Sequence, residues 1–456
     1  MYCEIINSFI KSLRALKVYI ESVEQVIHDV DDDTQFENDR LLAQIFYSVL
    51  KIKNSNKDFK EECYSSEKIK EIFEQGLKEY GAVEAEQKMD DIFKTFEEIA
   101  SFSERDEITG KYQYKSLPKN IRKKYEELEV YGKQRSILYS GTLMLLVTYY
   151  ENLISRVFRC DFARHPERIK LDAKAVTYKF LLEVNNVEEV KNHLIDEEVM
   201  SMMYKSHGDW MCYLENIIKL KLPCINDNKD RISEIIARRN LFVHNDGKVN
   251  SVYLGIISNS EFKRGEEIII SKEYLSNAID IIEMAGVSLV VELSLKEKWS
   301  DSNEIDKIEC MIYDEFFSAE KFENSRILYE IGLDSSKINQ TTKLDFLFNN
   351  WCSYKLLGKF NLVEKQVKEF DVSAYKPRYL LAKLALLDKY QDFFVEYDRQ
   401  DDLNDNMLKE WTIFKNVRTS EEFKRRFETS LETVHSAISN VDVNLDMEME
   451  EACQQK

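Results

Sequence analysis

Proline and glycine are scarce in this chain, whose 456 residues include only 4 Pro and 12 Gly. These are the residues that most often interrupt helices and strands and build turns. Charged residues, by contrast, make up 32% of the sequence. This composition argues against an architecture rich in turns and predicts an all-α protein.

Clustered motifs for metal or phosphate binding are also missing. The sequence has no Cys-x-x-Cys pair, no His-Glu-x-x-His motif and no glycine-rich phosphate loop. We therefore predict no metal site and no cofactor. We expect the scattered cysteines to be idle thiols in a reducing cytoplasm. They are Cys3, Cys63, Cys160, Cys212, Cys224, Cys310, Cys352 and Cys453.

The sequence has no apolar segment of the length that a bilayer requires. Its most apolar run, residues 143–147, is much shorter than the roughly 20 residues of a membrane helix. No segment resembling a signal peptide opens the sequence. We expect a soluble, cytoplasmic protein without a membrane partner.

Basic residues are fewer than acidic ones, with 64 Lys and Arg against 83 Asp and Glu, and the formal net charge is −19. Proteins that coat nucleic acid neutralise its phosphates with Lys and Arg, so the net charge argues against this class and any RNA contact must be local. The strongest basic stretch is either a weak RNA-binding site or a solvated helix face, depending on whether it lies beside Arg239. It consists of Lys115, Lys119, Arg122, Lys123 and Lys124, followed by Lys133 and Arg135.

The most informative stretch is residues 238–247, with the sequence RRNLFVHNDG, about midway along the chain. Helical spacing places Arg239 on one face with apolar residues before and after it. A guanidinium in such a stripe is costly unless an anion or several acceptors meet it. Packing alone gives no reason for this residue. The apolar members of the stripe are Ile232, Ile235, Ile236 and Val243.

Asn240 and His244 lie one helical turn apart and share an adjoining ridge. The helix edge therefore offers a fixed cation at Arg239, an amide, and an imidazole, which is the side chain best suited to proton transfer near neutral pH. Together these groups can hold a phosphate and move protons around it. Residues 245–247 are predicted to end this helix and Asp230 to cap its start.

At these residues the sequence resembles the HEPN ribonucleases, in which an Arg, usually followed by a polar residue, precedes a His near the end of a helix. Arg239, Asn240 and His244 match this pattern, and the resemblance covers roughly residues 115–297. It implies a helical bundle, cleavage of RNA and pairing of two copies through their motif helices. Downstream residues that many bacterial members share are Gly247, Val249, Asn250, Tyr253 and Leu254.

One position departs from a subclass of that family. Toxins that pair with a nucleotidyltransferase antitoxin carry a Tyr two positions after the His, where this sequence has Asp246. Regulation by modification of that tyrosine is therefore not implied.

Changes in composition predict four segments. A polar stretch around Gly110, followed by Pro118, marks the first boundary. The first segment opens with an amphipathic helix over residues 1–28 and continues with helices over 41–52, 68–80 and 82–102. The four segments are an N-terminal helical region (1–112), the HEPN-like bundle (113–299), tetratricopeptide-like helical hairpins (300–440) and a disordered acidic tail (441–456).

The HEPN-like segment is predicted to begin with two helices. The first, over residues 117–132, is charged, and the second, over 135–159, is apolar on all sides and must be enclosed. Glu151 is the acidic residue of that second helix. It either pairs with a basic residue such as Arg239, which we favour, or points out at the helix end.

Further elements are expected on both sides of the motif. His193 and His207 are expected in loops or at the surface. After the motif, residues 248–257 and 266–270 are predicted to form a short β excursion. Ser271 is then expected to cap a helix over 274–298 that completes an antiparallel bundle.

The C-terminal segment repeats itself. Residues 355–360 (KLLGKF) recur as residues 385–390 (ALLDKY), and residues 391–393 (QDF) are echoed at 421–423 (EEF). A period of this length is typical of stacked helix–turn–helix units. The segment resembles degenerate tetratricopeptide repeats, which implies a surface for a protein activator or antitoxin. A plain helical cap on the bundle is the alternative.

A single general acid–base histidine is poorly equipped to activate a nucleophile and protonate a leaving group in one step. Two-fold pairing would place two copies of the motif in one cleft, which is how HEPN enzymes are understood to work. We expect a metal-independent endoribonuclease with His244 as base or acid, Arg239 stabilising the phosphorane and Asn240 orienting the phosphate. Arg238 and Glu151 would support them.

The expected substrate is single-stranded or loop RNA, because in-line attack needs a splayed nucleotide. The resemblance implies a bacterial setting, either anti-phage defence or a toxin system. Two alternatives stay open. Either the domain is a catalytically silent HEPN module that binds RNA, or the protein is a helical-repeat adaptor in which the motif is structural.

Overall fold

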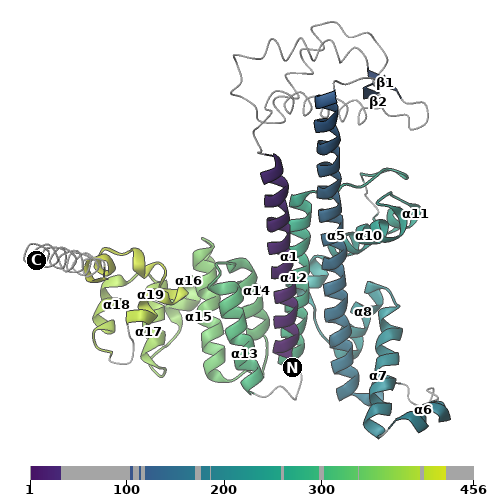
Figure 1. The fold of residues 1–456 in the computed structure, drawn as a ribbon. Helices are drawn as coiled ribbons and strands as arrows, with labels where there is room; N and C mark the ends of the chain where they lie inside the picture. Colours follow the sequence, from purple (N-terminus) through teal and green to yellow (C-terminus); the bar gives the residue numbers. More distant parts are fainter. Residues whose placement is uncertain are drawn as a thin grey trace, which may run out of the picture. The chain divides into compact units, whose positions relative to one another are not determined.

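A computed structural model describes most of the chain, and it is built from helices (Figure 1). One short antiparallel pairing joins β1, Ser103–Arg105, to β2, Tyr112–Tyr114. The predicted all-α fold class is confirmed. The helices predicted over 41–52, 68–80 and 82–102 and the tail 441–456 lie outside the described residues. The structure describes residues 2–31, 103–105, 112–114, 119–169, 176–184, 186–257, 261–296, 302–336, 338–400 and 405–427.

The chain divides into two compact units, each assembled from separate stretches of sequence. The first unit contains Met1–Lys11, Tyr149–Ile232 and Asp280–Lys456, and the second contains Ser12–Thr148 and Ser233–Ile279. Neither unit is therefore one continuous segment. The helices that carry the chain across the boundaries are α1 (Tyr2–Asp31), α5 (Lys119–Arg164), α10 (Lys229–Asn245) and α12 (Lys272–Lys296).

In the second unit, α1 buries the apolar face that its sequence predicts, including Leu13, Leu16 and Ile20. A carboxylate on the same helix, Glu24, accepts hydrogen bonds from the Tyr139 hydroxyl of α5 and from the Lys272 ammonium of α12. Burial alone would raise the pKa of Glu24, but these two donors outweigh it and lower the pKa. Glu24 thus ties three helices together as an ionised carboxylate.

Helix α5 is continuous over Lys119–Arg164, where the sequence predicted two helices. The expected break around Gly132 does not occur, because one glycine costs a helix only about 1 kcal/mol and no proline follows it. The helix is also not enclosed on all sides. Leu143 and Leu146 are fully buried, whereas Leu145 is 42% exposed.

The β excursion predicted after α10 is reduced to one bridge, in which Lys248 pairs with Glu267. The following residues form helix α11, Ser251–Ile256, instead of a strand. The reason is local: the side chain of Asn250 accepts a hydrogen bond from the backbone N–H of Tyr253 at 2.9 Å and caps the helix. The cap predicted at Ser271 is confirmed, since its hydroxyl accepts from the N–H of Tyr274 at 3.1 Å.

Short helices fill the first unit between α5 and α10. One of them, α9, ends just before the motif helix, and Asp230 lies inside the first turn of α10 instead of capping it as predicted. These elements are η2 (Pro166–Arg168), α6 (Tyr178–Glu183), α7 (Val187–Met203), α8 (His207–Tyr213), η4 (Leu214–Ile218) and α9 (Pro223–Asp227).

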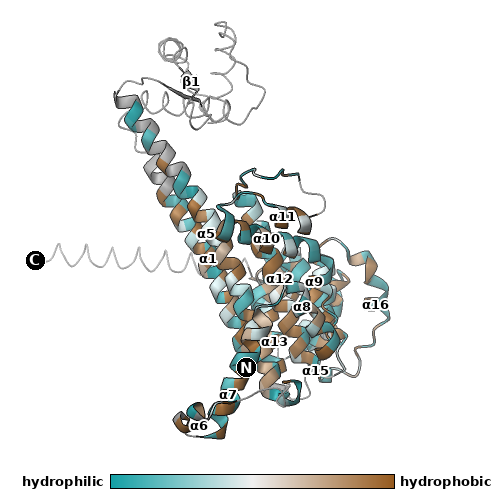
Figure 2. Cartoon of the chain, turned by 90° about the vertical axis from the view of Figure 1, so that its right-hand side faces the viewer, coloured by the Kyte–Doolittle hydropathy of each residue, from teal (hydrophilic) through white to brown (hydrophobic). Residues whose placement is uncertain are grey.

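In the same unit α12 runs close to α1 and α5 at Gly286. A Cβ atom added at Gly286 would lie 2.5 Å from the Phe9 ring and 2.9 Å from the Leu153 side chain. Only glycine fits this crossing without repacking. The helix around it is densely apolar, as its colouring in Figure 2 shows.

The chain after residue 302 folds into successive helical hairpins. Its elements are α13 (Ser302–Ile312), η5 (Tyr313–Phe317), α14 (Phe322–Leu333), α15 (Gln340–Leu356), η6 (Phe360–Leu362), α16 (Glu364–Glu369), α17 (Pro377–Leu386), α18 (Tyr390–Tyr397), α19 (Asp405–Glu410), η7 (Thr412–Phe414) and η8 (Val417–Thr419).

The repetition read in the sequence corresponds to a repeated helix end, which we call the lysine turn. A residue at positive φ is followed by Lys and an aromatic residue, and the Lys N–H donates to the carbonyl five residues earlier over 2.8 to 3.0 Å. This is a Schellman-type end. The three lysine turns are Glu320-Lys321-Phe322, Gly358-Lys359-Phe360 and Asp388-Lys389-Tyr390.

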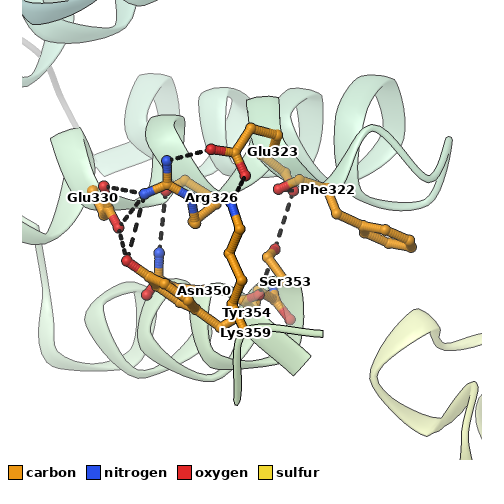
Figure 3. A network of polar contacts seen from close by, with 10 residues as sticks. Phe322, Glu323, Arg326, Glu330, Asn350, Ser353, Tyr354 and Lys359 are labelled. Atoms are coloured by element: carbon orange, nitrogen blue, oxygen red, sulfur yellow. Dashed lines mark hydrogen bonds and ion pairs between the residues drawn. The ribbon is translucent and has the colours of Figure 1, made fainter. Parts of the chain in front are cut away.

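Helices α14 and α15 form one hairpin, joined by polar contacts around Arg326 (Figure 3). Arg326 donates to Glu323 and to Glu330, each at 2.7 Å. The Tyr354 hydroxyl of α15 donates to Glu330 at 2.8 Å, and Lys359 of a lysine turn reaches Glu323 at 3.3 Å. The lysine turn that ends α15 is thereby linked to the preceding helix, α14.

Candidate functional site

Helix α10 carries the motif in its last two turns, and its buried side differs from the predicted stripe. In the second unit the interior takes Ile235, Ala237 and Leu241, of which none is more than 4% exposed. Val243, which the stripe placed inside, is 46% exposed. The stripe prediction was wrong at this end of the helix, because the neighbouring elements cover the Leu241 side instead.

The three proposed catalytic residues lie together near the end of α10. Asn240 and His244 are exposed, and their spacing of one turn places the amide and the imidazole along one edge. Arg239 is partly buried beside them, with its Nε atom in the interior. One end of one helix thus presents a cation, an amide and an imidazole.

Arg238, the residue before them, is engaged in contacts within the protein. Its guanidinium donates to Glu234 over 2.6 Å and lies 4.0 Å from the centre of the Tyr274 ring. The same carboxylate accepts hydrogen bonds from the hydroxyls of Tyr253 at 2.9 Å and Tyr274 at 2.6 Å. Glu234 therefore gathers donors from α10, α11 and α12.

This cluster around Glu234 is mostly buried, with side-chain exposures of 11% for Arg238 and 19% for Glu234. Burial opposes the charge of Arg238, but Tyr274 and Glu234 outweigh it and raise the pKa of the guanidinium. Burial, together with the charge of Glu234, raises the pKa of Tyr253 to about 12. All three donors stay protonated, so the cluster holds α10 in place and moves no protons.

The end of α10 follows the prediction, since the helix stops at Asn245. Asp246 and Gly247 both have positive φ, 53° and 70°, and the N–H of Gly247 donates to the Leu241 carbonyl at 3.1 Å. A Cβ atom at Gly247 would lie 2.8 Å from the Phe242 ring. Glycine is therefore required here both for its backbone conformation and for space.

Glu151, the proposed supporting carboxylate, lies on α5 in the first unit and is partly buried. Its pairing with a basic residue such as Arg239 stays a prediction.

Lys115 lies outside the described residues. The rest of the basic stretch lies at the start of α5, in the second unit, where Arg122 and Lys123 are exposed. Lys119 and Lys124 belong to the same turns of the helix. Figures 1 and 2 both show this end of α5 well away from α10. This separation from the motif helix favours a solvated helix face over an RNA contact shared with Arg239.

The part of the chain that the structure describes contains no group of three or more His, Cys, Asp or Glu side chains placed to hold a metal ion. No helix in the described ranges combines the length and apolar character needed to cross a bilayer. Its cysteines are free thiols, namely Cys3, Cys160, Cys212, Cys224, Cys310 and Cys352.

His207, expected at the surface or in a loop, is instead partly buried at the start of α8. Its Nε2 atom lies 3.1 Å from the Tyr150 hydroxyl, and the Trp210 ring packs against it with 5.9 Å between centroids. Burial, and secondarily the charge of Lys229, lowers the pKa of His207 to about 4. The local sequence held no signal of this, because Tyr150 comes from a distant helix.

Three comparisons with known proteins found no match. No family model fits the chain, and neither a curated protein nor a solved structure is similar to it at a significant level. The resemblance to HEPN ribonucleases therefore rests on the motif of α10 and the residues around it.

Proposed function

We propose that this protein is a metal-independent endoribonuclease that cleaves single-stranded or loop RNA in a cleft formed by two copies of the chain. The observation that carries the proposal is the exposed edge of α10, where Asn240 and His244 stand one turn apart beside Arg239. These side chains supply what phosphodiester cleavage needs, namely proton transfer and stabilisation of a phosphorane.

The reaction is a transfer within the RNA. The ribose 2′-oxygen loses its proton to the imidazole of one His244 and attacks the adjacent phosphorus. The bond to the 5′-oxygen breaks, and that oxygen takes a proton from the second His244. Arg239 and Asn240 bind the charged phosphate oxygens. The products are a 2′,3′-cyclic phosphate and a 5′-hydroxyl.

The contacts of Arg238 support this assignment of roles. Arg238 is bound to Glu234 and stacked on Tyr274, so it fixes the rotation of α10. That rotation leaves Asn240 and His244 exposed. Of the two adjacent arginines, we therefore assign the contact with the phosphate to Arg239.

Exposed apolar residues support the pairing of two copies. Val243 stands between Asn240 and His244 in sequence and is 46% exposed, and on the next helix Val252 and Ile256 are 68% and 49% exposed. Covering such side chains is favourable. An isologous contact there would bring two motifs together.

By resemblance, the setting of the enzyme is bacterial anti-phage defence or a toxin system in the cytoplasm. The hairpins after residue 302 would then receive a protein activator or antitoxin.

The proposal is tested by incubating purified protein with mixed cellular RNA in EDTA and mapping the product ends. Wild type should produce cyclic phosphate ends, and His244→Ala should lower the rate about 100-fold or more. His193→Ala, which removes an imidazole paired with Glu197 on α7, is the matched control and should cleave normally. Equal cleavage by wild type and His244→Ala would refute the site.

Two further measurements separate the alternatives. Light scattering should show a dimer that Val243→Glu disrupts together with cleavage. Because His244 is exposed, His244→Ala should change the free energy of unfolding by less than about 0.5 kcal/mol. RNA binding without cleavage would indicate a silent HEPN module. Loss of stability in His244→Ala would indicate an adaptor with a structural motif.

A further inference from the structure

The hairpins after residue 302 line a partly open cavity with a volume of about 240 Å³. About 10–15 Å³ of such volume already admits a water molecule, so a group of several heavy atoms fits. Its floor includes the buried rings of Phe348, Tyr379 and Phe414, and its rim includes the partly exposed rings of Tyr313 and Trp411. Aromatic side chains therefore form much of the lining of the cavity.

Three charged groups reach this cavity from three different helices. Glu309 lies on α13, Asp345 on α15 and Arg378 on α17. Arg378 donates to both oxygens of Asp345 at 3.0 Å, and the Tyr379 hydroxyl donates to the same carboxylate at 2.9 Å. The charge of Arg378 is thus matched by Asp345.

Glu309 also interacts with the charge of Arg378, but that guanidinium is hydrogen-bonded to Asp345 and not to Glu309. It lies within hydrogen-bonding reach of Thr342 and of Asp345, which is itself an acid. Burial and then the charge of Asp345 raise the pKa of Glu309 well above its usual range. The titratable groups that face Glu309 are Asp306, Cys310, Tyr329, Asp345 and Arg378.

We propose that this cavity binds an organic cation, an ammonium or guanidinium group on a short apolar stem, with Glu309 as the counter-charge and the aromatic rings around the cation. Aromatic faces attract cations through their quadrupoles, most strongly where water is excluded. The stem would lie against the apolar floor. The same chemistry is offered by a free small amine and by a Lys or Arg side chain of a peptide.

Binding is coupled to one proton. In the empty cavity Glu309 holds its proton over much of the neutral range. When the cation enters, the O–H bond of Glu309 breaks, the proton leaves to solvent and the carboxylate stays behind to pair with the ligand. The affinity for a permanently charged ligand therefore rises with pH until Glu309 is ionised in the empty protein.

The first test titrates full-length wild type with 1-butylguanidinium by calorimetry in buffers of different ionisation enthalpy. We expect saturable binding, release of a proton near neutral pH, and affinity that increases towards alkaline pH. The uncharged 1-pentanol should bind at least about tenfold more weakly. Absence of saturable binding, binding without proton release, or equal affinity for the alcohol would each overturn the proposal.

The second test uses Glu309→Gln, which keeps the shape of the side chain and removes its charge. It should weaken 1-butylguanidinium binding by about tenfold and abolish its pH dependence. Asp314→Asn, which removes an exposed carboxylate next to the same helix, should leave both unchanged. Circular dichroism establishes whether each variant is folded. If a variant does not fold, the release of a proton by wild type on binding 1-butylguanidinium is the measurement that decides the proposal.

The source of the cation is distinguished by two further ligands. Agmatine represents a free amine, and an arginine residue capped at both ends represents a peptide side chain. Tighter binding of the capped residue indicates a peptide partner, whereas tighter binding of agmatine indicates a small metabolite. Failure of both at concentrations where 1-butylguanidinium binds would overturn the inference.

Discussion

Glu234 and Arg238 face each other across one turn of α10, and their contact separates the roles of two adjacent arginines. Arg238 is held inside by the Glu234 carboxylate and the Tyr274 ring. Arg239 lies beside the exposed end of the helix. The cluster around Glu234 thus holds Arg238 away from the edge of α10 at which we propose that RNA binds.

Replacing Glu234 by Gln should destabilise the protein by about 3 kcal/mol, because the buried charge of Arg238 would lose its counter-charge. Urea unfolding monitored by circular dichroism measures this change. Glu261→Gln, at an exposed carboxylate of the same unit, is the control and should change stability by less than about 0.5 kcal/mol. Equal unfolding midpoints for the two variants would contradict a structural role for the pair.

His207 should make the stability of the protein fall in mild acid. Its pKa is lowered from 6.5 to about 4 in the folded protein, so a proton binds the unfolded chain more tightly. The stability that neutral His207 contributes is complete above pH 6.5 and is lost as the pH falls towards 4. Between pH 7.5 and pH 5 the loss amounts to about 2 kcal/mol.

The measurement is urea unfolding at a series of pH values for wild type and His207→Gln. The variant should lose about 2 kcal/mol less over this interval, because it has no imidazole to protonate. Parallel pH profiles for the two proteins would show that His207 is not the titrating group.

Replacing Gly358 by Ala should destabilise the chain by roughly 1–2 kcal/mol, because an L-residue is strained at positive φ. Gly358 has a φ of 70°, and an added Cβ would meet nothing within 4 Å, so the effect isolates the backbone. Gly141→Ala, at an equally open position inside α5, is the control and should stabilise by about 0.5–1 kcal/mol. Thermal unfolding of both variants measures whether the stability falls for Gly358→Ala and rises for Gly141→Ala.

The sequence predicted elements correctly where the residues of a single helix are enough to determine its buried face or its end. The face of α1 is an example: Phe9, Ile10 and Leu13 follow helical spacing and all are buried. The end of α10 is another, since Asn-Asp-Gly specifies a helix stop whatever surrounds it. Helix α11 could also have been recognised from the sequence, because Asn is a strong helix cap and Asn250 precedes its first residue.

The sequence did not predict features that depend on contacts between distant helices. Glu309, Asp345 and Arg378 each look like ordinary surface charges, and only the stacking of α13, α15 and α17 brings them to one cavity. Val243 and Leu241 are both apolar, and spacing alone could not say which one a neighbour covers. The proposed catalytic residues were found from the motif, whereas their exposure required the fold.

The lysine turn has a consequence for how this array can vary in length. Because the same helix end recurs at Glu320, Gly358 and Asp388, a chain that gained or lost one whole hairpin would keep every junction intact. The cavity would not survive that change, since it draws one charged residue from each of the three helices α13, α15 and α17. Junctions of this kind tolerate insertion, whereas the ligand that we propose would hold the number of hairpins constant.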